Sequence, residues 1–258
     1  MTFVNISLPQ LQMFFLVFLR VGSILLTLPI FNSRNIPVLF KMGLSFTVSL
    51  VLFPILNLDD LPLRPGLIPF GIGVISEVLI GVIIGLSVRT IFAGVQLAGQ
   101  LVGFQMGLAM ANVIDPTSSD QVPLLAQVNN LIALLIFLVI DAHHWFLRAL
   151  VESFRLVPPF DFELSSSLVE QFTALAGNMF VIAVKVGAPM IAVLLLMSVA
   201  FGLAARTVPQ MNIFFVAMPL KIIVGLLFLT FTVPYFVSLL EMIFNGLGKD
   251  ILRLLQAM

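Results

Sequence analysis

Long runs of apolar residues, separated by short polar breaks, constrain this chain more than any other feature of its sequence. A helix needs about 20 apolar residues to cross the hydrocarbon core of a bilayer, which is about 30 Å thick. Runs of that kind recur along the chain, whereas the alternating segments of a membrane β-barrel are missing from the sequence. The sequence therefore predicts an all-α fold, a polytopic integral membrane protein of bent helical hairpins.

The polar breaks divide the chain into elements and into two parts. The expected helical segments are residues 8–30, 38–56, 67–92, 93–114, 124–140 with an amphipathic continuation, 168–204 and 213–247. Each of the last two is longer than the hydrocarbon core is thick, so Pro189, Pro219 and Pro234 within them predict bends, or helices that leave the membrane. We expect a first part, residues 1–160, of short elements, and a second part, residues 161–258, of one long helical hairpin.

Composition excludes several classes of protein. The chain is 60% hydrophobic and 9% charged, whereas a soluble domain carries about 25% charged residues. The formal net charge of zero provides no basic footprint for nucleic acid, and the absence of cysteine excludes disulfides, thiolate chemistry and cysteine-based metal sites. The first apolar stretch lacks a basic leader and a small-residue cleavage site, so we expect a retained span rather than a signal peptide.

Five charged residues lie in or beside apolar runs: Arg20, Glu77, Arg89, Lys185 and Lys221. Each would cost about 2.5–3.5 kcal/mol in the middle of a membrane. Glu77 and Arg89 are too far apart along one helix to pair, so each needs a partner elsewhere in the chain, in another subunit or in water. Snorkelling to the interface is the alternative for Arg89 and Lys221. Several unpaired charges predict that the chain packs inside a protein assembly.

Nothing in the sequence indicates catalysis. Adjacent His143 and His144 should point about 100° apart on a helix, and Asp141 with His144 supplies only two ligands, so we expect a structural or interfacial role and no metal. Nucleophile-elbow, P-loop and dinucleotide-binding patterns are missing from the sequence. The expectation is a protein that is not an enzyme and has no cofactor.

Residues 96–110 would place small and polar side chains on one helical face and bulky apolar ones on the other. The first face comprises Gln96, Gly99, Gln100, Gly103, Met106, Gly107 and Met110. Gln105 falls on the apolar face and must find a polar partner there. One interpretation is a close helix contact through the glycines. The other is that this face borders a water-lined path, with the irregular "NVIDPTSSDQVP" filling a cavity.

Three segments carry a resemblance to a known family. "QLAGQLVGFQMG" and its flanks, "FLVIDAHHWFLRALVESFRLVPP", and the hairpin around "ARTVPQMN" resemble, in this order, segments of the FliR family of flagellar type III export-apparatus proteins. Injectisome export proteins are similar. One departure is Asp141-Ala142, where family members often have Asn-Gly.

The resemblance implies a subunit of a closed helical assembly in the bacterial inner membrane at the flagellar basal body. Its partners would be FliP-like and FliQ-like subunits and an FlhB-like protein, and unfolded protein substrates would pass through the gate. The first part of the chain would be FliP-like and the terminal hairpin FliQ-like. A plug at about residues 106–122 is implied, with plug or lumen residues Gln96, Gln100, Gly103, Gln105, Met106, Gly107, Met110, Asn112, Asp115 and Pro116.

The resemblance also implies a functional turn between the last two helices, with Arg206, Pro209, Gln210, Asn212 and, just beyond, Lys221. The positive-inside bias places this turn in the cytoplasm. A second hypothesis from the residues is a self-sufficient secondary transporter with broken helices and a charged midplane site. Transporters usually show two related halves, and the sequence has no counterpart of "ARTVPQMN" in its first half.

Overall fold

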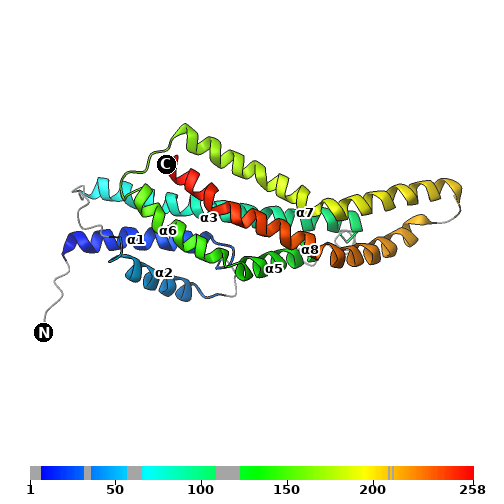
Figure 1. Cartoon of the computed structure of the whole chain (residues 1–258), viewed down its shortest axis with the longest axis horizontal. Helices are drawn as coiled ribbons and strands as arrows, with labels where there is room; N and C mark the ends of the chain where they lie inside the picture. The colour runs from blue at the N-terminus through cyan, green and yellow to red at the C-terminus, as the bar shows by residue number, and fades with distance from the viewer. Residues whose placement is uncertain (1–6, 32–35, 57–65, 109–122, 209, 211) are drawn as a thin grey trace. The chain divides into compact units, whose positions relative to one another are not determined.

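The computed structural model of the chain describes residues 7–31, 36–56, 66–108, 123–208, 210 and 212–258 (Figure 1). These residues form helices and no strand, which confirms the all-α prediction. The helices are α1 (Leu8–Thr27), α2 (Val38–Leu52), α3 (Leu67–Met106), α5 (Leu124–Val139), α6 (Ala142–Leu156), α7 (Ser166–Thr207) and α8 (Ile213–Gln256).

Four of the described helices, α1, α3, α7 and α8, are long and apolar enough to cross a membrane. Helices α5 and α6 form a bent pair that would make a fifth span if the pair crosses as one, and α2 is a shorter apolar helix. The predicted class, a polytopic membrane protein of apolar helices, is therefore confirmed.

Helix α3 differs from the expectation of two elements meeting at residues 92 and 93. It is one continuous helix of 40 residues. No proline interrupts residues 70–106, so nothing in the backbone forces a break where the composition becomes more polar. The helix ends at Met106 because Gly107 adopts φ 84, and the Leu108 amide donates to the Gly103 carbonyl at 3.1 Å, as in a glycine-terminated helix.

The two long helices expected near the end of the chain are present. Helix α7 has 42 residues and α8 has 44, and both extend beyond the predicted bounds. Pro189 lies inside α7, and Pro219 and Pro234 lie inside α8, so the prolines do not end either helix.

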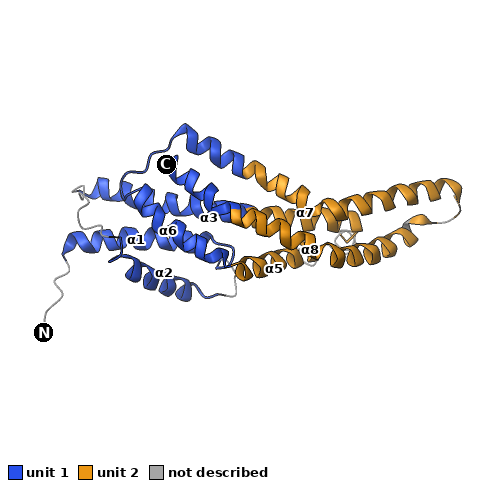
Figure 2. Cartoon of the chain, viewed as in Figure 1, with its two compact units in different colours: residues 1–90, 141–175, 246–258 blue, residues 91–140, 176–245 orange. Residues whose placement is uncertain are grey.

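Two compact units make up the fold (Figure 2). Unit 1 comprises Met1–Thr90, Asp141–Leu175 and Gly246–Met258, and unit 2 comprises Ile91–Ile140 and Ala176–Asn245. Helices α3, α7 and α8 each supply residues to both units. The boundary expected at residues 160 and 161, between a part of short elements and one long helical hairpin, stays a prediction.

Candidate functional site

A buried ion pair lies in unit 1, between α1 and α3. Arg20 and Glu77 are both 0% exposed. The Arg20 Nε and Nη2 groups each donate to one carboxylate oxygen of Glu77, with Nη2 to Oε1 at 2.9 Å. This fork is the strongest geometry that a guanidinium and a carboxylate can form.

The same guanidinium also holds the end of α6. Its Nη1 donates to the Ser153 carbonyl at 2.8 Å, and its Nη2 donates to the Val157 carbonyl at 2.9 Å. The Phe154 ring lies 4.1 Å from the guanidinium carbon. A positive charge is favourable here because the last carbonyls of a helix have no helical partner and carry partial negative charge.

This network decides between the alternatives that the sequence left open for Arg20 and Glu77. Arg20 and Glu77 find their partners inside the chain and need neither a neighbouring subunit nor water. Close approach of the helices makes the pair possible, because a Cβ added at Gly81 would lie 2.8 Å from the Arg20 carbonyl oxygen. No local pattern in the sequence links Arg20 to Ser153, Phe154 and Val157, so these partners were not predicted.

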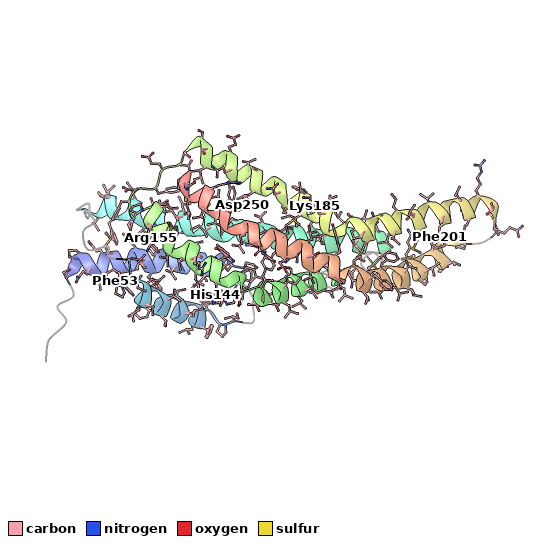
Figure 3. All side chains as sticks on the ribbon, viewed as in Figure 1. Phe53, His144, Arg155, Lys185, Phe201 and Asp250 are labelled. Atoms are coloured by element: carbon pink, nitrogen blue, oxygen red, sulfur yellow. The ribbon has the colours of Figure 1, made fainter. Side chains whose placement is uncertain are left out.

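The other three charged residues in or beside apolar runs are not fully buried. Arg89 and Lys185 have exposed side chains and Lys221 a half-buried one (Lys185 is labelled in Figure 3). None of the three forms an ion pair with another residue that the structure describes. They stay accessible to water, lipid head groups or another protein.

At the end of α3, in unit 2, the small and polar face is buried at Gly99, Gly103 and Met106, whereas Gln96 is exposed. Phe104 on the opposite face is 61% exposed. A Cβ at Gly99 would lie 2.6 Å from the Ala126 Cα, so Gly99 is a contact residue between α3 and α5. Gln96, exposed, supports this contact by donating to Asn130 at 2.9 Å.

Three neighbouring positions differ from Gly99. Among the described residues, a Cβ at Gly103 would meet only Leu125 Cδ1, at the ordinary distance of 3.8 Å. Gln100 is half-buried. The Oε1 of Gln105 is buried and accepts no hydrogen bond from any described residue. The polar partner expected for Gln105 therefore stays a prediction.

Methionines anchor the end of α3. Met106 is 0% exposed and packs in a buried cluster with Val102, Leu125, Met190 and Leu194. It fills a notch at Gly225 of α8, where an added Cβ would lie 2.6 Å from Met106 Cε. Met218 approaches Gly107 in the same way, at 3.0 Å. We call Met106 and Met190, with the partly buried Met197 packed against them, the methionine cluster; only Met106 was singled out from the sequence.

Several predicted site residues lie outside the described residues. These are Met110, Asn112, Asp115, Pro116 and Pro209, together with most of the predicted plug at 106–122. In the turn between α7 and α8, Arg206, Gln210 and Asn212 are exposed.

The two adjacent histidines do not point apart as expected. The ring centroids of His143 and His144 are 4.3 Å apart, at the start of α6. Both rings face the carboxylate of Asp141, so three groups rather than two come together.

The fold and this site define a polytopic helical membrane protein with an internally paired buried charge and a methionine-packed helix end. The chain belongs to the family of bacterial export proteins, family 1, whose model matches residues 11–247. It is 37% identical to the flagellar biosynthetic protein FliR of Bacillus subtilis, over 84% of this chain and 84% of that protein. It is 31% identical to FliR of Escherichia coli, over 92% of this chain and 90% of that protein. The resemblance to FliR is thereby confirmed.

Proposed function

We propose that this chain is a non-catalytic subunit of the flagellar type III protein export gate in the bacterial inner membrane. It assembles with FliP-like and FliQ-like subunits, with an FlhB-like protein associated, to form the path for unfolded flagellar substrates. Membership of a family of bacterial export proteins supports the export role. Residues 1–160 take the FliP-like place in the assembly and residues 161–258 the FliQ-like place.

The observation that carries the proposal is the length of exposed apolar surface on α8. The helix has 44 residues, which is about 66 Å along its contour. Exposed apolar side chains run from Val216 through Phe231 to Leu252. In its most apolar 18-residue window only 11% of the residues are buried.

A bilayer does not cover that length. Along the helix about 54 Å separates Val216 from Leu252, and a tilt of about 40° reduces this to about 41 Å, still above the ~30 Å core. The exposed apolar surface of helix α7 is also longer than the hydrocarbon core is thick, since its exposed apolar side chains run from Val169 to Leu203. Apolar surface outside the hydrocarbon has to be covered by protein, and neighbouring FliP-like and FliQ-like subunits would provide the cover.

Co-purification tests this proposal against the transporter hypothesis. The full chain, tagged, is expressed with and without the FliP-like and FliQ-like proteins of the same organism and extracted in mild detergent. The proposal expects a large complex that contains both partners, and a chain that loses protease resistance when they are missing. A monomer or dimer of unchanged resistance, with neither partner bound, would support the transporter instead.

The plug is a second element of the proposal. Residues 106–122 obstruct the export path, and the methionine cluster fixes the end of α3 from which this segment starts. Support comes from Met106, which fills the Gly225 notch, and from the helix stop at Gly107. Methionine side chains seal against varied shapes because they are flexible and apolar.

Deletion of residues 112–121 in a strain that carries the partners tests the plug. We expect the complex to assemble and the membrane to become leaky to small ions, measured as poor growth on high salt and as dye entry. An assembled complex with no leak and unchanged secretion would remove the plug from the proposal and leave the export role intact.

A further inference from the structure

Three potential metal ligands lie together at the start of α6, in unit 1 and apart from the Arg20 network. One ligand atom each from Asp141, His143 and His144 lies within 4.8 Å of the others. Asp141 Oδ1 is 3.8 Å from His143 Nε2 and 3.8 Å from His144 Nδ1. His144 is labelled in Figure 3.

The backbone explains how neighbouring residues meet here. Asp141 adopts the left-handed conformation, with φ 55 and ψ 28, between α5 and α6. An aspartate in this N-cap position normally accepts a hydrogen bond from an amide of the first turn. The Asp141 carboxylate makes no such bond, so it faces the two imidazoles instead.

The two nitrogens of His143 have different surroundings. Its Nδ1 is buried and has no hydrogen-bond partner among the described residues, whereas its Nε2 is the nitrogen nearest to the Asp141 carboxylate. An imidazole that is protonated on the enclosed nitrogen directs the lone pair of the other nitrogen outward. His143 can therefore offer Nε2 as a ligand on the same side as Asp141.

The distances suit a small ion. Around a tetrahedral ion with ligands at about 2.05 Å, neighbouring ligand atoms are about 3.4 Å apart. The two carboxylate–imidazole distances of 3.8 Å exceed this by a few tenths of an ångström, and all three ligand atoms lie within 4.8 Å of one another. The side chains of Asp141 and His144 are 66% and 62% exposed, so small side-chain rotations can close the gap.

We propose that Asp141, His143 and His144 bind a divalent transition-metal ion of the zinc class, with water in the remaining position. Two imidazoles and one carboxylate match the ligand preference of zinc, copper and nickel, whereas magnesium and calcium prefer oxygen ligands. The bound ion ties the first turn of α6 to the residue that precedes it. This site is independent of the proposed export function.

The only tryptophan of the chain provides a direct probe. Trp145 follows His144 and is half-exposed, so all tryptophan emission reports on this turn. The full chain, carrying a histidine-free tag and purified in detergent, is titrated with Cu²⁺ or Ni²⁺, which quench tryptophan at short range. We expect saturable quenching by one ion per chain, reversal by EDTA, competition by Zn²⁺ and no response to Mg²⁺.

Two variants test the ligands. Asp141→Asn keeps a residue that tolerates the left-handed backbone, and His144→Gln changes an exposed side chain, so both should fold. Each removes a ligand and should weaken ion binding at least about tenfold, since loss of even a group that only supports a ligand costs about that much. Glu152→Gln removes another carboxylate from α6 and should leave the affinity unchanged.

Three results would overturn the proposal. The first is unaltered affinity in Asp141→Asn or in His144→Gln. The second is quenching that does not saturate, which would mean collision rather than binding. The third is an equal response to Mg²⁺, which would indicate a simple carboxylate contact. Absorption of bound Co²⁺ is a second measurement on the unaltered chain, since imidazole ligation in a tetrahedral site gives intense visible bands and water ligation alone does not.

Discussion

Arg20 shows how a buried charge becomes tolerable. Removing two ions from water costs several kcal/mol each unless good geometry and further hydrogen bonds offset the loss. Here the guanidinium donates to both carboxylate oxygens of Glu77 and to two backbone carbonyls at the end of α6. Hydropathy marked both residues as out of place, but Arg20 and Glu77 are 57 positions apart and no periodicity connects them.

Glu77→Ala should destabilise the chain by about 3–5 kcal/mol, because it leaves the Arg20 guanidinium buried without its counter-charge. Thermal unfolding of the purified protein in detergent, followed by circular dichroism, measures the change. The double variant Arg20→Met, Glu77→Leu should recover only part of the loss. It removes the stranded charge but leaves the Ser153 and Val157 carbonyls without their donor.

The exposed ion pair on α6 is the matched control for this prediction. Arg155 Nη1 lies 3.6 Å from Glu152 Oε2, and both side chains are accessible to water. Glu152→Gln should change stability by less than about 1 kcal/mol. Similar losses in Glu77→Ala and Glu152→Gln would mean that the buried pair contributes no more than a surface pair.

Helix α3 shows which features of a helix can be predicted from the sequence and which depend on packing. Its apolar pattern predicted a helix in this region, and its end near Gly107 follows from glycine chemistry. Which face of its last turns is buried was not predictable, because that depends on α5, which follows later in the chain. Both faces contribute buried residues, Gly99 and Gly103 from the small and polar face and Ala98 and Val102 from the apolar one.

Gly99→Val and Gly103→Ala should have opposite outcomes. At Gly99 an added side chain meets the Ala126 backbone, which cannot move without separating α3 from α5, so we expect a loss of about 2 kcal/mol or more. At Gly103 a methyl group makes only ordinary contact with the described residues, and alanine's better helix propensity adds up to about 1 kcal/mol. Thermal stability in detergent distinguishes them, and equal effects would contradict the helix-contact role of Gly99.

The turn after α7 gives a prediction of topology. Arg206 is exposed in the last turn of α7, and the positive-inside bias favours the cytoplasm for it. A cysteine at exposed Thr207 has no background, since the chain has no cysteine of its own. It should react with a membrane-impermeant maleimide in inverted vesicles and not in intact cells. Labelling of intact cells would reverse the topology.

Contacts between segments that are far apart in the sequence could not be predicted. The apolar runs were enough to predict an all-α membrane protein, because bilayer thickness sets helix length directly. The two compact units were not foreseen, since each combines segments from early and late in the chain. The same applies to the methionine cluster, in which Met106 meets Gly225 more than a hundred residues away.

Coverage of α8 by other subunits is open to a direct measurement. Single cysteines at Val216 and Leu252 mark the two ends of its exposed apolar surface, and one at Phe231 marks the middle. In membranes that hold the chain alone, at least one end position should react with a water-soluble maleimide, because about 54 Å of helix separates them and the bilayer core is about 30 Å thick. Co-expression of the FliP-like and FliQ-like proteins should suppress that reaction at least about fivefold, since protein then replaces water on that surface.

Phe231 is the internal control, because its side chain is 76% exposed in the chain and lies far from both ends of α8. A cysteine there should stay unreactive with and without the partners, first covered by lipid and then by protein. The membranes are opened so that the reagent reaches both faces. A difference in reactivity between the positions therefore cannot result from access to one side alone. If both end positions are protected in the chain alone, the bilayer or a second copy of the chain already covers α8. If they react equally in both preparations, no partner covers this helix, and the main argument for an assembled gate subunit fails.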